Sequence, residues 1–170
     1  MFASPSVVHR PAHLHLVIAA SLAGTLAAFE AASGRVHWAL ALGKPLFSSP
    51  VACETLERVL LGCVNARVYC ARLADGALLW TLPTDGPVYS ANVLELCDED
   101  EEEEEDEEQV DDHNRFASAP ASAPRSRLRL AVGAIGSHDA HLYLFDLRDG
   151  RLLARHALDS PLYAVPSLSL

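Results

Sequence analysis

The sequence predicts an all-β fold of about three four-stranded antiparallel sheets, and two observations support this. A segment of 27 residues occurs three times, at 24–50, 66–92 and 140–166. Glycine and proline recur at matching places in the three copies, namely Gly34, Gly76 and Gly150, and Pro45, Pro87 and Pro161. Short runs of Val, Leu and aromatic residues, broken by Gly, Pro, Asp or Asn, are typical of strands joined by tight turns. A period near 40 residues indicates a repeat architecture.

The apolar run at 14–29 has two interpretations. It follows His9, Arg10 and His13, as the apolar part of a secretory signal peptide follows basic residues. It is too short and too interrupted for a transmembrane helix. The repeat favours a β-hairpin with a turn near 22–24, because 17–20 aligns with 59–62 and 25–29 aligns with 67–71. A cleaved signal peptide stays open as the alternative.

Each copy is predicted to contain four strands. In the second copy we expect them near 47–53 (or the equivalent 89–96), 59–63, 68–73 and 77–82. Tight turns are predicted at 32–34, 74–76 and 148–150, where a glycine follows a small or acidic residue. Glycine supplies the positive φ that such a hairpin turn needs.

The predicted strands are apolar on both faces. Leu26–Phe29 and Leu142–Phe145 do not alternate between apolar and polar residues, as they would in a sheet with one wet face. Sheets stacked radially, each between two neighbours, fit this pattern, and that arrangement is a β-propeller. Trp38 and Trp80 are then expected to pack between sheets, with an aromatic platform for a planar ligand as the alternative.

An acidic insertion separates the second and third copies. Residues 98–112 hold 13 of the 23 acidic side chains, and the formal net charge is −10. The run continues into an Ala/Ser/Pro-rich stretch, and such a segment cannot bury enough apolar surface to fold. We therefore divide the chain into two repeats at 1–97, a disordered insertion at 98–126 and a third repeat at 127–170. This charge, without basic patches, argues against nucleic-acid binding.

The repeat resembles a known family at specific positions. Ala28-x-Glu30-x-x-Ser33-Gly34-x-x-x-Trp38 is similar to the pyrroloquinoline-quinone (PQQ) repeat, Ala-x-Asp-x-x-x-Gly-x-x-x-Trp. Asp75-Gly76-x-x-x-Trp80 keeps the second half of this pattern, and Asp146-x-x-x-Gly150 keeps part of it. Five residues are thus structural repeat positions: Gly34, Trp38, Gly76, Trp80 and Gly150. The resemblance implies blades of a quinoprotein-like propeller, which has seven or eight repeats.

A second resemblance concerns two short stretches, Phe47-Ser48-Ser49-Pro50-Val51 and Gly62-Cys63-x-Asn65-x-x-Val68-Tyr69-Cys70. They are similar to the C-terminal propeller of 2-aminoadipic semialdehyde dehydrogenase-type acyl-CoA synthetases, the beta-alanine-activating enzymes. That family activates an acid by adenylation and transfers it to a phosphopantetheine thiol. Neither a Gly-rich adenylate-forming loop nor a carrier-type serine motif occurs in the 170 residues. Any ligase activity is therefore expected to lie outside this chain.

We assign no catalytic, cofactor-binding or metal-binding residue. The chain has no adjacent cysteines of the kind that PQQ dehydrogenases use, and three repeats are too few to enclose a central cofactor. The four cysteines lack zinc-site spacing, so buried free thiols in a reducing compartment are expected, with disulfides as the alternative. His13 with His15, and His138-Asp139 with His141, are interpreted as surface groups rather than metal ligands.

These observations predict a non-catalytic propeller module from a larger protein. We expect its partners to be other domains of that protein or protein partners, with no nucleic acid or membrane, and its location to be cytoplasmic. The alternative is a secreted or luminal PQQ-repeat scaffold for protein interactions. In either case, three repeats leave two sheet faces without a neighbour.

Overall fold

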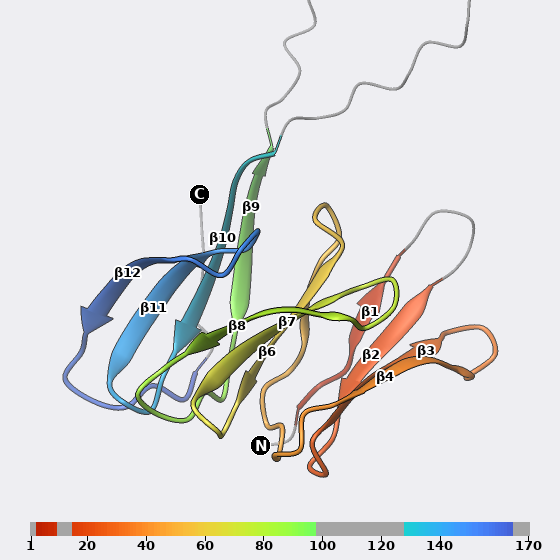
Figure 1. Ribbon diagram of the computed structural model, residues 1–170, viewed down its shortest axis with the longest axis horizontal. Helices are drawn as coiled ribbons and strands as arrows, with labels where there is room; N and C mark the ends of the chain where they lie inside the picture. The colour runs from red at the N-terminus through yellow and green to blue at the C-terminus, as the bar shows by residue number, and fades with distance from the viewer. Residues whose placement is uncertain (1–2, 10–14, 98–127, 165–170) are drawn as a thin grey trace, which may run out of the picture.

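The computed structural model describes residues 3–9, 15–97 and 128–164, and within these ranges it contains strands and no helix. Twelve strands form three four-stranded antiparallel sheets (Figure 1). The first sheet contains β1 (Ser6–Val8), β2 (Leu16–Ala20), β3 (Thr25–Glu30) and β4 (Val36–Ala41). The second contains β5 (Val51–Cys53), β6 (Arg58–Cys63), β7 (Arg67–Arg72) and β8 (Leu78–Pro83). The third contains β9 (Asn92–Cys97), β10 (Leu128–Gly136), β11 (His141–Asp146) and β12 (Leu152–Ala157).

The strands of each sheet follow chain order, so each sheet is a simple meander. The first strand of the second sheet, β5, contacts both β1 and β9, which are the first strands of its neighbours. The three sheets therefore stand side by side with their first strands together and their last strands apart (Figure 1). This radial arrangement confirms the predicted architecture.

The predicted strands agree with the structure except at the start of each repeat. We expected a strand at 47–53, but β5 begins at Val51, and the strand expected at 89–96 begins at Asn92. Pro50 lies inside the first of these runs and cannot donate a ladder hydrogen bond, so pairing there begins after it. Residues 43–50 and 84–91 are instead connections that bring the chain from the last strand of one sheet to the first strand of the next.

The apolar run at 16–30 forms the hairpin of β2 and β3, in which Ile18 pairs with Ala28. Among the described residues, no helix is long and apolar enough to cross a membrane. The insertion predicted at 98–126 lies outside the described residues, and its disorder stays a prediction. The strands on either side of it, β9 and β10, pair with each other in antiparallel register.

The same turn closes the hairpin between the last two strands of every sheet. Gly34, Gly76 and Gly150 have φ values of 70, 72 and 76°, in the left-handed region that favours glycine. Each glycine N–H donates to the carbonyl four residues earlier, at 2.8–2.9 Å. The Ser33, Asp75 and Asp149 side chains accept a hydrogen bond from the backbone N–H two residues later. The repeated sequence thus encodes one turn geometry three times.

Two hydrophobic clusters fill the spaces between the sheets. The cluster between the first and second sheets includes Leu26, Val59 and Tyr69. The cluster between the second and third sheets includes Val68, Cys70 and Phe145. Tyr69 of β7 belongs to the first cluster, whereas its chain neighbours Val68 and Cys70 belong to the second. The second sheet is therefore covered on both faces, which is why the middle residues of β6 and β7 are apolar on both faces.

Candidate functional site

A tryptophan–glycine contact joins each pair of neighbouring sheets. Trp38 on β4 lies against Gly76, where a Cβ atom would come within 2.5 Å of the indole Cε3. Trp80 on β8 lies against Gly150 in the same way, since a Cβ atom at Gly150 would come within 2.6 Å of the Trp80 Cε3 atom. Only glycine leaves room for the indole ring at these two turns, and only glycine adopts their positive φ without strain.

A hydrogen bond fixes the orientation of each indole ring. The Nε1–H group of Trp38 donates to the Leu73 carbonyl at 2.9 Å, and that of Trp80 donates to the Leu147 carbonyl at 3.2 Å. Leu73 and Leu147 each precede their turn glycine by three residues. The two contacts are therefore the same interaction, made once between the first and second sheets (the first interface) and once between the second and third sheets (the second interface).

The five predicted repeat positions differ in their surroundings. The structure brings Trp38 to Gly76 and Trp80 to Gly150, whereas no atom lies within 4 Å of a Cβ built at Gly34. The position equivalent to the two tryptophans in the third sheet is Ala154. The series of contacts thus begins with an uncovered glycine and ends with an alanine.

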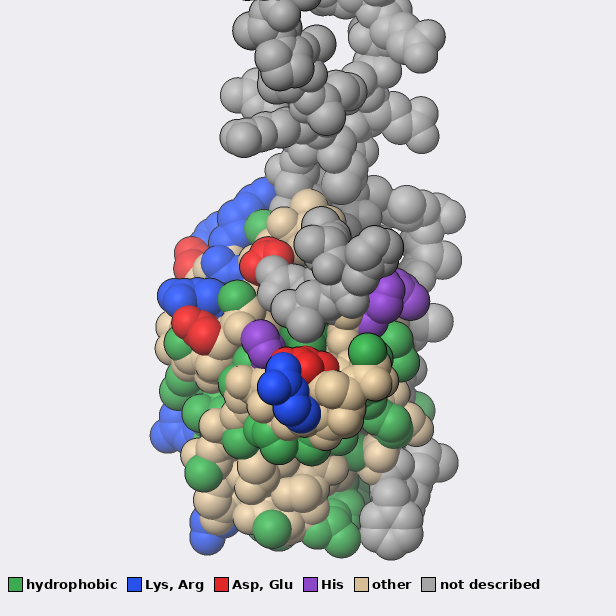
Figure 2. Space-filling model, turned by 90° about the vertical axis from the view of Figure 1, so that its right-hand side faces the viewer, with side chains coloured by type: hydrophobic (Ala, Val, Ile, Leu, Met, Phe, Trp, Pro, Cys, Tyr) green, Lys and Arg blue, Asp and Glu red, His purple; other side chains and the backbone are tan. Residues whose placement is uncertain are grey.

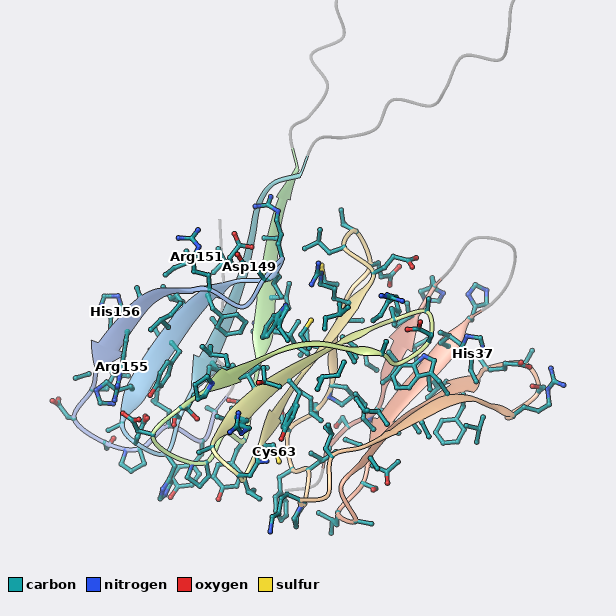
Figure 3. The ribbon with its side chains drawn as sticks, in the orientation of Figure 1. His37, Cys63, Asp149, Arg151, Arg155 and His156 are labelled. Atoms are coloured by element: carbon teal, nitrogen blue, oxygen red, sulfur yellow. The ribbon has the colours of Figure 1, made fainter. Side chains whose placement is uncertain are left out.

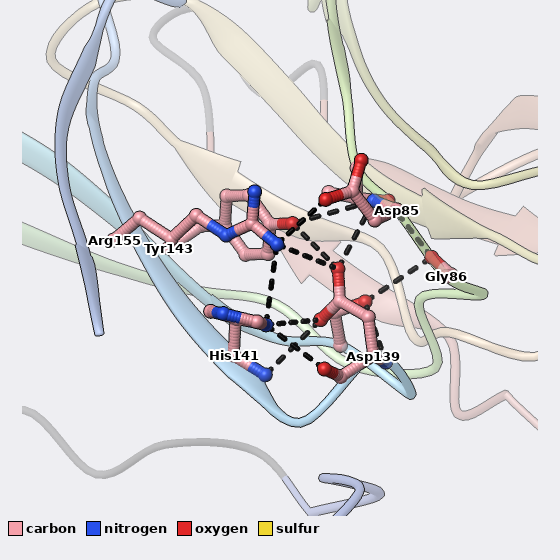
Figure 4. Close-up of polar contacts among 8 residues, drawn as sticks. Asp85, Gly86, Asp139, His141, Tyr143 and Arg155 are labelled. Atoms are coloured by element: carbon pink, nitrogen blue, oxygen red, sulfur yellow. Dashed lines mark hydrogen bonds and ion pairs between the residues drawn. The ribbon is translucent and has the colours of Figure 1, made fainter. Parts of the chain in front are cut away.

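A polar cluster crosses the second interface (Figure 4). The Asp139 carboxylate accepts hydrogen bonds from the Tyr143 hydroxyl at 2.5 Å and from the Asp85 backbone N–H at 3.0 Å. The Arg155 guanidinium forms an ion pair with Asp85 at 2.6 Å. It also lies over the Tyr143 ring, with Cζ 5.2 Å from the ring centre. Asp85 belongs to the connection after β8, whereas Asp139 lies in the turn between β10 and β11, and Tyr143 and Arg155 lie on β11 and β12. The cluster therefore links the third sheet to the end of the second.

The protonation states in this cluster are fixed at neutral pH. Burial by itself would raise the pKa of Asp139, but hydrogen bonds from Tyr143 and from backbone N–H groups hold that pKa below its ordinary value. Burial, together with the hydrogen bond to Asp139, raises the pKa of Tyr143 to about 12. Asp139 is therefore an ionised acceptor and Tyr143 a neutral donor. Because neither group exchanges a proton near pH 7, the cluster is suited to holding the sheets together rather than to acid–base catalysis.

Sequence reasoning missed this cluster, because it treated His138, Asp139 and His141 as groups of a surface turn. Only His138 is exposed, and the Asp139 side chain is 10% exposed. The repeat contained a usable clue. Asn65 precedes Tyr69 by four residues, as Asp139 precedes Tyr143, and the Asn65 amide donates to the Tyr69 hydroxyl at 2.7 Å. An Asn or Asp four residues before a tyrosine thus indicated a paired tyrosine hydroxyl in the second and third sheets.

Three aligned aromatic residues form a row along the connections between sheets. The Phe47 and Tyr89 ring centres are 6.1 Å apart, and the Tyr89 and Tyr163 ring centres are 5.8 Å apart. His138 stands beside this row, and its Nε2 atom lies 2.6 Å from the Tyr163 hydroxyl. These contacts hold the segment after the third sheet, which contains Tyr163, against the connection between the second and third sheets, which contains Tyr89.

Three of the cysteines are buried within the sheets. Cys53, Cys63 and Cys70 are buried, and Figure 3 shows Cys63 within the module. Burial raises the pKa of the Cys63 thiol, and it raises that of Cys70 to about 11. These thiols are protonated at neutral pH and are therefore poor nucleophiles.

The predicted histidine pair is only partly described. His15 lies beside His9, with ring centres 5.1 Å apart, whereas His13 is outside the described residues. No group of three His, Cys, Asp or Glu side chains within the described ranges is placed to hold a metal ion. The interpretation of these histidines as surface groups stays a prediction.

The repeated turn, the indole contact and the radial sheets place this chain among known proteins. The family model PQQ_2, which is described as outer membrane protein assembly factor BamB, matches residues 22–168 of this chain. The chain belongs to this PQQ-repeat family. Each of its three sheets is accordingly one PQQ-like blade of a β-propeller.

A solved structure supports the same fold. The crystal structure of BamB from Moraxella catarrhalis matches 91% of this chain and 37% of that chain, with a TM-score of 0.53 at 12% sequence identity. At this identity the likeness concerns the fold alone. The three blades thus correspond to part of a larger propeller.

A curated relative is similar in sequence over part of the chain. The beta-alanine-activating enzyme of Drosophila melanogaster is 30% identical over 96 residues, which are 56% of this chain and 9% of the fly protein. The chain therefore spans a small fraction of that relative.

Proposed function

We propose that this chain is a non-catalytic arc of the propeller in a larger protein similar to an ATP-dependent acyl-CoA synthetase of the beta-alanine-activating type. The observation that carries this proposal is the pair of identical tryptophan–glycine interfaces, because the repeated residues all serve packing or turning. The 30% identity to the fly enzyme supports the choice of parent. Acid activation and thiol transfer then take place in domains outside these 170 residues.

The proposed partners are other domains of the same protein or separate proteins. The polar side chains at the blade interfaces are engaged with one another, so recognition falls to the outward surfaces. Figure 3 shows His156 on β12, the last strand of the third blade, with Asp149 and Arg151 at the adjoining turn. A cytoplasmic location is part of the proposal, and the protonated, buried thiols of Cys63 and Cys70 are compatible with a reducing compartment.

The test begins with the full-length transcript, in which we expect an adenylation domain. ATP–pyrophosphate exchange is then measured with the full-length protein and with a variant that lacks residues 1–170. We expect exchange with an amino acid such as β-alanine to persist in the deletion variant. Exchange catalysed by the 170-residue chain itself, or a transcript without an adenylation domain, would overturn the proposal.

A second candidate is a secreted or luminal interaction scaffold, and the match to the BamB family model favours it. N-terminal sequencing of the protein from cells and from the medium separates the two candidates. Cleavage near Ala28 would support the scaffold, whereas a protein that retains β2 and β3 in the cell would support the synthetase-type parent.

A further inference from the structure

We propose that a zinc ion binds between His9 and His15 and ties β1 to β2. The site is independent of the proposed function and belongs to the first hairpin of the chain. It uses one imidazole nitrogen from each histidine, and water completes the coordination of the metal. Imidazole is a ligand that suits Zn²⁺, whereas carboxylates suit harder cations such as Mg²⁺ and Ca²⁺.

The two histidines face each other across the open end of the hairpin. β1 and β2 are antiparallel, and their last paired residues are Val8 and Leu16. His9 and His15 are the next residues on either side, so they continue the same register as a directly opposed pair. Opposed residues of an antiparallel pair have Cβ atoms about 4.5–5.5 Å apart, which brings their side chains together.

The separation of the two rings suits a shared metal ion. Their centres are 5.1 Å apart and their planes meet at 73°. Two imidazole nitrogens on one Zn²⁺ lie about 2.0–2.1 Å from the metal, which places the ring centres roughly 5 Å apart in a tetrahedral site. His9 is exposed and His15 is half-buried, so the pair is accessible from solvent. Figure 2 looks onto the end of the molecule formed by the first sheet, where histidine side chains reach the surface.

One nitrogen of the pair lacks a partner. The Nδ1 atom of His15 is buried and has no hydrogen-bond partner within the described ranges. Buried polar atoms nearly always have a partner, and neutral imidazole is the commonest metal ligand in proteins. This unsatisfied nitrogen is therefore a second indication, independent of the ring separation, that a ligand belongs at the end of the hairpin.

The second blade closes the equivalent hairpin in a different way. Glu54 and Glu57 follow the last residue pair of β5 and β6, in the places that the two histidines have in the first blade. The Glu57 N–H donates to the Glu54 carbonyl at 3.1 Å, so a backbone hydrogen bond closes a tight turn. Five residues, 10–14, separate the histidines, which makes the first loop longer than this turn. A metal ion between the side chains would close the longer loop.

Closure of this hairpin matters for the first interface. β1 has only three residues, and Val8, the last of them, is fully buried in the first hydrophobic cluster. β1 also contacts β5 of the second blade. Short terminal strands open easily, so a metal ion at the end of β1 would favour its paired state. The expected consequence is that zinc stabilises the first strand of the chain.

The test is a Zn²⁺ titration of the 170-residue chain, produced without a histidine tag and followed by long-range ¹H–¹⁵N spectra of the histidine rings. Excess Mg²⁺ occupies the carboxylates of the acidic run at 98–112. We expect the ring nitrogens of His9 and His15 to shift together at one equivalent of Zn²⁺. H9A should weaken binding at His15 roughly tenfold or more, since loss of even a group that only supports a ligand costs about 10–100-fold.

Two further variants control the titration. H9C replaces the imidazole with a thiolate, which Zn²⁺ also accepts, so it should restore the binding that H9A loses. H156A removes an exposed histidine of β12 and should leave the titration unchanged. Far-UV circular dichroism checks that each variant keeps its sheets.

Amide hydrogen exchange tests whether the metal ties the strands together. Saturating Zn²⁺ should slow exchange of the paired amides of β1 and β2 roughly tenfold or more, because opening the hairpin would release the metal. The hairpin of β5 and β6, which a backbone hydrogen bond closes, is the internal control and should be unaffected.

Three results would overturn the proposal. Unshifted ring nitrogens at millimolar Zn²⁺ would mean that the pair binds no metal. Full affinity at His15 in H9A would mean that His9 is not a ligand. A shift of both rings without slower exchange in β1 and β2 would mean that the metal does not tie the strands. None of these results depends on whether the parent protein contains an adenylation domain.

Discussion

The two blade interfaces share one contact and differ in the polar groups around it. In the first interface, Trp38 covers Gly76, and the nearby Tyr69 hydroxyl is paired with the neutral Asn65 amide. In the second, Trp80 covers Gly150, and the equivalent tyrosine is paired with the charged Asp139, within reach of Arg155. The indole contact is thus the general element of a blade interface, and the polar cluster is particular to one pair of blades. Such a pair-specific cluster provides a means of distinguishing one neighbour from another.

Removal of an indole should have the largest effect. Truncation of a buried tryptophan costs about 3–5 kcal/mol, so W38A is expected to lower the free energy of unfolding by an amount in this range. Trp38 is 7% exposed, whereas Trp80 is half-buried, so W80A should cost less than W38A. Urea denaturation followed by circular dichroism measures both variants. Equal costs would show that burial does not distinguish the two interfaces.

Glycine substitution should have the next largest effect, and the chain provides a matched control. G76A and G34A both place alanine at a positive φ, which costs about 1–2 kcal/mol. Only at Gly76 does the new Cβ meet an indole, at 2.5 Å, so G76A should cost roughly 1–3 kcal/mol more than G34A. The difference between their urea midpoints measures the steric requirement of the contact. Identical midpoints would contradict it.

The polar cluster should make the second interface sensitive to pH. The folded-state pKa of Tyr143 is raised from 10 to about 12, so its stabilising contribution is complete below pH 10 and is lost as the pH rises towards 12. The folded-state pKa of Asp139 is lowered, so its contribution is complete above the unfolded-state pKa and is lost as the pH falls through the folded-state value. We expect Y143F to reduce the alkaline loss and D139N to reduce the acid loss.

Thermal melts from acid to alkaline pH test both variants against the wild-type chain. Y69F is the control for Y143F, because the Tyr69 hydroxyl is paired with an amide rather than a carboxylate. If Y143F and Y69F reduced the loss of thermal stability at alkaline pH by the same amount, the Asp139 carboxylate would have no special role.

Removal of the exposed ion pair at the edge of the polar cluster should have the smallest effect on the unfolding free energy. Arg155 and Asp85 form an ion pair with side chains that are 36 and 67% exposed. Exposed pairs typically contribute below about 1 kcal/mol, so D85A should change the unfolding free energy by less than that amount. A cost comparable to that of W80A would instead place this ion pair at the centre of the interface.

The fold was predictable from the sequence because each blade repeats the same local rules. Gly34, Gly76 and Gly150 identified the turns, and the lack of alternation in Leu26–Phe29 and Leu142–Phe145 indicated sheets covered on both faces. The start of β5 was predicted too early, because Phe47–Cys53 has strand-like composition although its proline prevents pairing along its whole length.

The interfaces were only partly predictable. The packing role of Trp38 and Trp80 followed from the repeat, but their partners could not be read from the spacing, since the contact joins residues 38 and 70 positions apart. The polar cluster was missed because it joins Asp85 to Asp139 across the insertion. No local pattern relates two residues whose proximity depends on how the blades stack.

The most direct test of the account is a double-mutant cycle between Trp38 and Gly76. If the indole ring is what requires glycine at this turn, G76A should lower the unfolding free energy less in a W38A background than in the wild type. The remaining loss should equal that of G34A, which backbone strain sets at about 1–2 kcal/mol. The unfolding free energies of the wild type, W38A, G76A and W38A/G76A are sufficient for the measurement. Additive costs would contradict the account, because they would mean that the two residues stabilise the blades independently.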